Sequence, residues 1–278
     1  MAAIAKAMPN SRRATASSPE RGEKMKPLQG KVAIVTGASS PVGIGAAVAR
    51  RLAASGAKLL LVADDSPEAV AKECAGLLGD AGGVVPLTVD LGDADAVLAM
   101  VAEAEKRFGR IDLLVNNAAI RLNRTFGEFT AAEFDKAVAV NLRAPFLASQ
   151  AVLPSMRRQG GGRIVHVASQ LGSVAYQTRT IYGMTKAALI HLAKSMALEL
   201  ARENIQVNTV SPGPIATQPL LDRARDQPEE SARRMDYVPM GRFGRPEEIG
   251  EVVHWLLTTD ASFLTGQDLI VDGGYTIH

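Results

Sequence analysis

The stretch Lys31–Ala54 reads K-V-A-I-V-T-G-A-S-S-P-V-G-I-G-A-A-V-A-R-R-L-A-A, and its periodicity changes at a glycine-rich centre. The part up to Thr36 is a short β-branched run, typical of a buried strand, whereas Ala46–Ala54 has apolar residues at helical spacing. Three glycines lie between the two parts: Gly37, Gly43 and Gly45. Glycines let a backbone approach a pyrophosphate closely, and a helix N-terminus offers it unpaired N–H groups. The stretch therefore predicts a strand, a nucleotide-binding turn and a helix.

Strand and helix patterns alternate through the rest of the chain. The expected strands are 58–63, 84–89, 111–115, 163–167, 206–210 and 269–271, and the expected helices are 67–78, 93–108, 130–158, 181–202 and 246–259. This alternation gives a parallel sheet covered on both faces. Segment 211–217 is expected to be a rigid turn. Segment 217–245, with mixed charge, three prolines and weak periodicity, is expected to be a mobile lid or substrate loop. We predict an α/β fold: a single-domain, Rossmann-type, doubly wound parallel sheet with helices on both faces.

The first 27 residues differ in composition from the rest. Residues 1–27 hold six basic and two acidic side chains, and their apolar residues show no amphipathic periodicity. We expect a disordered or processed tail over residues 1–27, followed by one dinucleotide-binding and catalytic domain over residues 28–278. A transit peptide and a true start at Met25 stay open as alternatives.

Composition excludes several classes of function. Outside the tail the chain carries 25 basic and 27 acidic residues, and aromatic residues make up 4% of the sequence, which argues against a nucleic-acid groove. The single cysteine, Cys74, allows no disulfide framework, and the four histidines lack ligand spacing, so we expect no metal site. No apolar run reaches the length of a membrane span. We expect a cytoplasmic protein with no nucleic-acid or membrane partner; organellar import through the tail stays open.

Three side chains suggest acid–base chemistry. Tyr182 and Lys186 are separated by one turn of an expected helix and therefore share a face. A phenol titrates at about pH 10 in water, and a fixed cation beside it favours the phenolate, so the pair suits proton transfer. Ser169 follows an apolar strand, where α/β sheets present side chains to ligands, and it could hold a substrate oxygen.

An acidic residue indicates which dinucleotide is bound. The strand at 58–63 ends in Asp64, nineteen residues beyond Gly45, where a carboxylate would reach the adenosine ribose. Such a carboxylate accepts hydrogen bonds from ribose hydroxyls and repels a 2′-phosphate. No Arg or Lys lies between Gly37 and Gly45 to offset it. We therefore predict NAD as the cofactor, with NADP less favoured.

With these motifs in this order, the sequence from Lys31 to Tyr275 resembles the short-chain dehydrogenase/reductase family. The resemblance implies that Asp90 and Leu91 contact adenine, and that the turn after Pro212 lies beside the nicotinamide carboxamide. It implies a catalytic set of Asn141, Ser169, Tyr182 and Lys186. The cofactor-binding residues it implies are Gly37, Ser39, Gly43, Ile44, Asp64, Asp90, Leu91, Asn117, Ala118, Tyr182, Lys186, Pro212, Gly213, Ile215 and Thr217.

The resemblance also implies a mechanism, in which hydride passes between the nicotinamide and a secondary alcohol or ketone. Tyr182 would move the hydroxyl proton, and Lys186 would hold the ribose and favour the phenolate. Ser169 would position the substrate oxygen, and Asn141 would support a water relay to Lys186. The family's oligomers imply a homotetramer or homodimer.

The chain departs from the family pattern at two positions. Five residues rather than three separate Gly37 from Gly43, which puts the path of the turn in doubt, and Ala119 replaces a glycine after the N-N-A segment. Polar residues flank the expected site and are consistent with a sugar-like or polyol substrate: Arg121, Asn123, Gln170, Gln177 and Arg179. Solvation at the protein surface explains the same residues equally well.

Two other functions stay open. One is an NADPH-dependent ketone reductase, such as a 3-oxoacyl-thioester reductase, against which Asp64 argues. The other is a catalytically silent dinucleotide-binding scaffold, against which the intact set of Ser169, Tyr182 and Lys186 argues.

Overall fold

The computed structural model describes residues 26–277, so nearly all of the tail expected over residues 1–27 lies outside the described residues. In this part of the chain, seven strands form a sheet in the order β3-β2-β1-β4-β5-β6-β7, and every neighbouring pair is parallel. The strands are β1 (Val32–Thr36), β2 (Lys58–Ala63), β3 (Val84–Thr88), β4 (Leu113–Asn116), β5 (Gly162–Val167), β6 (Ile205–Pro212) and β7 (Asp268–Val271). The predicted fold class is confirmed.

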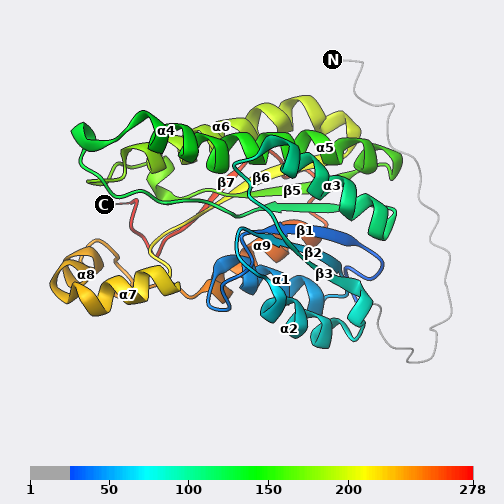
Figure 1. The fold of residues 1–278 in the computed structure, drawn as a ribbon, viewed down its shortest axis with the longest axis horizontal. Coiled ribbons are helices and arrows are strands. Elements are labelled where there is room, and N and C mark those ends of the chain that lie inside the picture. Colours follow the sequence, from blue (N-terminus) through cyan, green and yellow to red (C-terminus); the bar gives the residue numbers. More distant parts are fainter. Residues whose placement is uncertain (1–25, 278) are drawn as a thin grey trace, which may run out of the picture.

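Helices cover both faces of the sheet (Figure 1). One face carries α1 (Ile44–Ala54), α2 (Glu68–Leu78) and α9 (Pro246–Thr258), and the other carries α3 (Ala94–Phe108), α5 (Ala144–Arg158) and α6 (Thr180–Leu200). Successive strand residues point to opposite faces, so Ala33 and Val35 of β1 join the first apolar core while Ile34 joins the second. Among the described residues, no helix is long and apolar enough to cross a membrane.

The helix expected over 130–158 is interrupted. It consists of α4 (Ala131–Val138), a π-helical turn at Ala139–Arg143 and α5. A π turn admits an extra residue without ending the helix, so the apolar pattern continues across it and hides it from periodicity. The turn places Asn141 in the interior, where it is fully buried.

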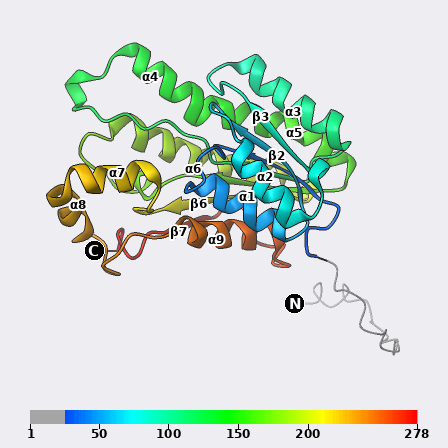
Figure 2. The same cartoon turned by 60° about the horizontal axis from the view of Figure 1, so that its bottom comes forward.

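Two expectations near the C-terminal third are wrong. Segment 217–245 is not a loop, because it forms α7 (Gln218–Asp226) and α8 (Pro228–Met235), which lie together at one end of the molecule (Figure 2). Both helices have proline in the first turn, where its fixed φ suits a helix start. Strand β6 also runs into the expected turn as far as Pro212, because Ser211 and Pro212 pair with β7.

The strand order reverses between β1 and β4. From β1 the chain winds outward to β2 and β3, then returns to β4 on the other side of β1. Because all strands are parallel, their carboxyl ends meet at one edge, and ligands of such sheets bind at the point of reversal. The fold therefore directs attention to the edge where Thr36 and Asn116 end β1 and β4.

Candidate active site

A cleft of about 760 Å³ opens at this edge of the sheet. It is lined by residues that follow the strands, and the sequence-predicted residues Ser169, Tyr182 and Lys186 are among them. All the predicted cofactor-binding residues line it as well: Gly37, Ser39, Gly43, Ile44, Asp64, Asp90, Leu91, Asn117, Ala118, Pro212, Gly213, Ile215 and Thr217. Asn141 does not line the cleft and lies buried behind its wall.

The glycine turn leaves backbone groups open to the cleft. Gly37 has φ +70°, and a Cβ there would lie 2.8 Å from the Cα of Ala118. A Cβ on Gly45 would collide with the carbonyl oxygen of Gly37. Gly43 caps α1 without a side-chain hydrogen bond, so the first N–H groups of the helix remain available to an anion. These features fit a dinucleotide diphosphate.

Two hydrogen bonds fix the path of the lengthened turn. The Gly43 N–H donates to the Ser40 carbonyl at 2.9 Å, and the Arg50 guanidinium donates to the Pro41 carbonyl at 2.8 Å. The longer spacing therefore forms a hydrogen-bonded turn directly before α1. The N-terminus of α1 still faces the cleft through Gly43 and Ile44.

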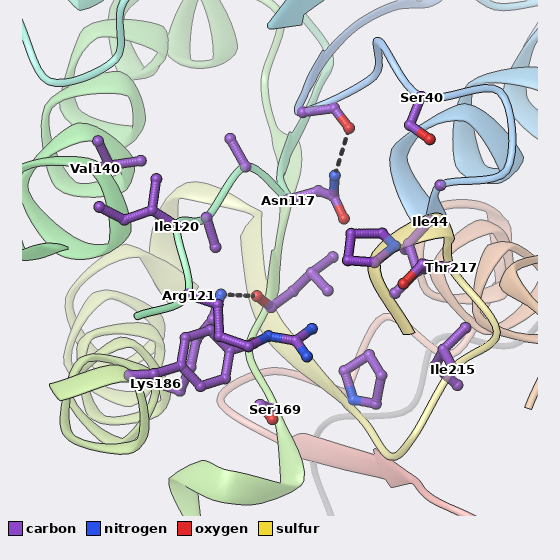
Figure 3. Close-up of a pocket in the computed structure, with 18 of the residues that line it drawn as sticks. Ser40, Ile44, Asn117, Ile120, Arg121, Val140, Ser169, Lys186, Ile215 and Thr217 are labelled. Carbon is purple, nitrogen blue, oxygen red and sulfur yellow. Dashed lines mark hydrogen bonds between the residues drawn. The ribbon is translucent and has the colours of Figure 1, made fainter. Parts of the chain in front are cut away.

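Hydrogen bonds tie the ends of β1 and β4 together beneath the cleft. The Asn117 amide donates to the carbonyls of Thr36 at 2.9 Å and Gly37 at 3.0 Å, and it lies in the middle of the site in Figure 3. The Thr36 hydroxyl accepts from the N–H groups of Asn117 and Ala118 at 3.0 and 3.1 Å. This network holds the N-N-A segment against the glycine turn and gives the cleft a fixed floor.

The carboxylates on the cleft wall follow β2 and β3. Asp64 is exposed directly after β2, and Asp90 follows β3. The nearby arginines of α1 are directed elsewhere: Arg50 is paired with Glu73 at 2.7 Å, and Arg51 with Glu251 at 2.7 Å. This side of the cleft is therefore acidic.

Tyr182 and Lys186 share a face of α6, as the sequence predicts. The Lys186 ammonium nitrogen lies 5.6 Å from the Tyr182 ring centroid and donates to the Val167 carbonyl at 2.7 Å. Burial, and then the positive charge of Arg121, lower the pKa of Lys186 to about 7. Ser169 lies two residues beyond β5, and its hydroxyl oxygen accepts from the Leu171 N–H at 3.2 Å. The phenol of Tyr182, the ammonium of Lys186 and the hydroxyl of Ser169 thus all line the cleft, in which Figure 3 labels Lys186 and Ser169.

Asn141 braces this region from behind. Its Oδ1 accepts from the Ile120 N–H at 2.9 Å, and its Nδ2 donates to the Ile120 carbonyl at 3.0 Å and to the Thr185 hydroxyl at 3.1 Å. The bonds join the loop after β4 to the residue beside Lys186. The relay to Lys186 stays a prediction, whereas the bonds themselves define a positioning role.

Sequence reasoning placed some polar residues correctly and others not. Arg121, Asn123 and Gln170 line the cleft, whereas Gln177 and Arg179 do not, because Arg179 points into the protein and is 2% exposed. Two cations that line the cleft were not predicted from the sequence: Lys136 and Arg223. The spacing of Lys136 from Val140 could have indicated a shared helix face, but Arg223 lay in the segment expected to be a loop.

Within residues 26–277, no group of three or more His, Cys, Asp or Glu side chains could hold a metal ion.

Comparisons with known proteins agree with this geometry. A family model described as enoyl-(acyl carrier protein) reductase matches residues 37–276. A 3-oxoacyl-(acyl-carrier-protein) reductase FabG of Thermotoga maritima is 36% identical over 252 residues, covering 90% of this chain and 99% of the relative. A D-threitol dehydrogenase of Mycolicibacterium smegmatis is 38% identical (90% and 94% covered), and an NAD-dependent glycerol dehydrogenase of Listeria innocua is 36% identical (89% and 94% covered).

Solved structures show the same likeness. A short-chain type dehydrogenase/reductase from Mycobacterium marinum superposes with a TM-score of 0.82 at 37% identity, over 91% of this chain and 98% of the other. A putative 2-deoxy-D-gluconate 3-dehydrogenase from Agrobacterium tumefaciens, with bound NADP, superposes with a TM-score of 0.83 at 30% identity, over 92% of this chain and 100% of the other.

Proposed function

This chain belongs to the short-chain dehydrogenase/reductase family, and on that premise we propose that it is an NAD-dependent dehydrogenase of a polar, sugar-like or polyol secondary alcohol. As a member of the family it is an oxidoreductase that acts on alcohols or ketones with a nicotinamide cofactor. The D-threitol and glycerol dehydrogenases among its relatives act on polyols by name, which supports the proposed substrate class.

The position of Asp64 carries the proposal for NAD. Its exposed carboxylate ends β2 on the cleft wall, where ribose hydroxyls can donate to it and a 2′-phosphate would be repelled. The two arginines of the neighbouring helix, Arg50 and Arg51, are already paired with Glu73 and Glu251. The acidic side of the cleft therefore lacks, among the described residues, a free cation from α1 to receive that phosphate.

The proposed chemistry follows from the side chains around Tyr182. When bound, the nicotinamide supplies the hydride acceptor. Tyr182 takes the proton from the substrate hydroxyl, and the positive charge of Lys186 favours the phenolate that this requires. Ser169 holds the substrate oxygen, and the Asn141 bonds fix the loop at Ile120 and the helix at Thr185, so that the reacting groups keep their distance.

Two further assignments belong to the proposal. We propose a homotetramer or homodimer, supported by exposed apolar side chains such as Phe146 on α5 and Leu198 on α6. We also propose the cytoplasm as its compartment, since a chain with one cysteine forms no internal disulfide.

A second candidate function is reduction of a 3-oxoacyl thioester with NADPH. The FabG relative and the description of the family model favour it. It requires NADPH to bind although Asp64 lines the cleft, so the two candidates differ in a measurable cofactor preference.

Fluorescence titration of the purified protein with NADH and NADPH distinguishes the candidates. We expect NADH to bind more tightly, by roughly tenfold or more, because the Asp64 carboxylate accepts ribose hydrogen bonds and repels the additional phosphate. The Asp64→Ser variant should lose most of this preference, whereas Asp65→Ser, whose side chain bonds the Ser66 N–H outside the cleft, should keep it. A wild-type preference for NADPH would favour the thioester reductase.

A further inference from the structure

Arg121 extends into the cleft beside the catalytic tyrosine. Its guanidinium carbon lies 5.6 Å from the Tyr182 ring centroid, the same distance as the Lys186 ammonium nitrogen. Figure 3 shows its side chain directed into the open space near Ser169 and Lys186. The backbone before it is fixed, because both polar groups of Ile120 are bonded to Asn141. The Arg121 guanidinium is therefore held over the Tyr182 ring within the cleft.

Charges in the cleft are separated by sign. The lining residues include two carboxylates, Asp64 and Asp90, which follow β2 and β3 on the side predicted to hold adenosine. The lining cations come from other segments: Arg121, Lys136, Lys186 and Arg223. Among the described lining residues, the region around Tyr182 thus has cations and lacks a carboxylate to neutralise them. A negatively charged group is the complementary ligand for such a region.

The guanidinium of Arg121 is available for such a ligand. Its neighbour on the same loop, Arg124, is paired with Glu133 at 3.1 Å. Within residues 26–277, no carboxylate forms a salt bridge with Arg121, whose guanidinium lies over the Tyr182 ring. A guanidinium presents two parallel N–H donors that match the two oxygens of a carboxylate.

The cofactor diphosphate is a poor explanation for Arg121. The diphosphate fits the glycine turn and the start of α1, which Ser40 and Ile44 mark on one side of the site in Figure 3. Arg121 lies with Lys186 and Ser169 on the other side of that view. Its charge is therefore directed to the substrate.

We propose that Arg121 binds a carboxylate of the substrate, which makes the substrate a hydroxy acid, with a polyol acid as the form that also uses the polar lining. The inference rests on the proposed function and narrows its substrate class. In the reaction, the alcohol C–H bond breaks with transfer of hydride to NAD, the O–H bond breaks with transfer of the proton to Tyr182, and a ketone forms. The carboxylate on Arg121 is unchanged.

A carboxylate on Arg121 would also change the electrostatics of Lys186. After burial, the positive charge of Arg121 is the second cause that lowers the pKa of Lys186. A carboxylate bound to Arg121 would offset that charge and favour the ammonium form of Lys186. Substrate binding would thus supply the cation that the phenolate of Tyr182 requires.

Matched pairs of alcohols test the proposal. Oxidation with NAD is followed for gluconate against sorbitol, for 3-hydroxybutyrate against 2-butanol, and for glycerol 3-phosphate against glycerol. The variant is Arg121→Gln, and the matched control is Arg124→Gln, which makes the same change three residues away outside the cleft. Arg121→Lys tests whether charge without the paired donors restores the preference in part.

A binding measurement removes the dependence on turnover. The Tyr182→Phe protein, loaded with NADH, is titrated calorimetrically with gluconate and with sorbitol. We expect gluconate to bind more tightly than sorbitol, and we expect Arg121→Gln in this background to weaken gluconate binding on the order of 10- to 100-fold while changing sorbitol binding little. The Lys186-dependent pH midpoint of kcat/KM should also move upward in Arg121→Gln, a change that a merely structural residue would not produce.

The outcomes distinguish the role of Arg121 from the dehydrogenase activity itself. Equal use of acids and neutral alcohols, unchanged by Arg121→Gln, would overturn the assignment of Arg121 and leave the proposed dehydrogenase intact. A preference for glycerol 3-phosphate over the carboxylates would replace the carboxylate by a phosphate ester and so also overturn it. Lack of oxidation of every pair with either cofactor would instead count against the proposed function.

Discussion

Lys186 lies in an environment that opposes its own charge. It is 2% exposed, its ammonium has the Val167 carbonyl as a hydrogen-bond acceptor, and the nearby guanidinium of Arg121 repels it. An isolated buried ammonium is costly, and the cost appears as the lowered pKa of about 7. The same residue is thus a source of positive charge for Tyr182 and a source of instability for the protein.

The pH dependence of stability should reveal this cost. Because the pKa of Lys186 is about 7 in the folded protein and 10.5 in its ordinary state, the unfolded chain binds more protons between these values. The free energy of unfolding therefore rises with pH across this window. The stability gained by deprotonation of Lys186 is lost as the pH falls through 7. Urea titrations measure this effect. Between pH 6 and pH 9, the free energy of unfolding of the wild type should rise by about 2 to 3 kcal/mol more than that of Lys186→Met.

Lys194→Met is the control for this measurement. Lys194 is exposed on the same helix, so its replacement should shift the unfolding curves equally at both pH values. If Lys186→Met also shifted them equally, burial of the Lys186 charge would not be the source of the cost.

Tyr182 offers a separate test of the proton transfer. Tyr182→Phe removes the hydroxyl and keeps the ring that Arg121 and Lys186 approach. We expect kcat to fall by roughly 10²- to 10⁴-fold, the range of a lost acid–base group, while the dissociation constant of NADH changes less than about threefold. Steady-state assays and fluorescence titration measure the two quantities. Full turnover in this variant would contradict the mechanism.

For single residues, the sequence predicts which residues belong to the site better than it predicts where their side chains point. Tyr182 and Lys186 were predictable because helical spacing alone places them on one face. Arg179 was not, because a turn residue can point into the cleft or into the protein, and packing decides which. The same holds for Arg121, whose direction depends on the bonds between Ile120 and Asn141.

Among the elements, the π-helical turn has a direct structural effect. It brings Asn141 into contact with the loop after β4 and with Thr185 on α6, so three segments meet at one amide. Asn141 is fully buried, its bond to Thr185 is buried and its bonds to Ile120 are partly buried, so loss of the amide would remove bonds that water replaces only in part. The turn therefore links the position of the cleft wall to the position of α6.

Replacement of Asn141 by Ala tests this coupling. We expect a loss of about 3 kcal/mol in the free energy of unfolding, because three hydrogen bonds disappear and a small cavity remains. We also expect a reduced kcat, since Ile120 and Thr185 lose their common partner. Asn123→Ala, on the exposed part of the same loop, should change stability by less than about 0.5 kcal/mol. Equal stability losses in the two variants, measured by urea unfolding, would argue against a stabilising role of the Asn141 hydrogen bonds.

Element boundaries were predictable where burial is continuous. The strand expected at 58–63 and the helix expected at 67–78 agree with β2 and α2 to within one residue, since both carry a clear apolar pattern. Helices α7 and α8 were missed because few of their side chains are buried, Leu220 being the buried one recorded for α7. A helix with so little apolar contact leaves a weak periodic signal.

For the whole molecule, the cleft lies where the two halves of the sheet meet. Residues at or just after the ends of β1 and β2 form one side, and residues at or just after the ends of β4, β5 and β6 form the other, so a dinucleotide in the cleft would contact both halves. A ligand that binds the folded state and not the unfolded chain stabilises the fold in proportion to the logarithm of its concentration.

NADH should therefore raise the thermal stability. At about 100 times its dissociation constant it is expected to add about 2.7 kcal/mol to the free energy of unfolding, which corresponds to roughly 5 to 10 °C in Tm for a domain of this size. NADPH at the same concentration should add less, because of Asp64. Differential scanning calorimetry makes the comparison, and equal shifts with the two cofactors would contradict the proposed preference.

The pairing of β1 with β4 has a consequence for synthesis of the chain. Thr36 and Asn117 are 81 residues apart, so the ribosome releases β1 and its first partner, β2, well before β4 can close the other edge. An open strand edge is a template for association with other chains. We infer that β1 is the segment that needs protection in the nascent protein, and that the dinucleotide turn becomes competent only when the loop closes. Pulsed hydrogen exchange during refolding would show this as late protection of the β1 and β4 amides together.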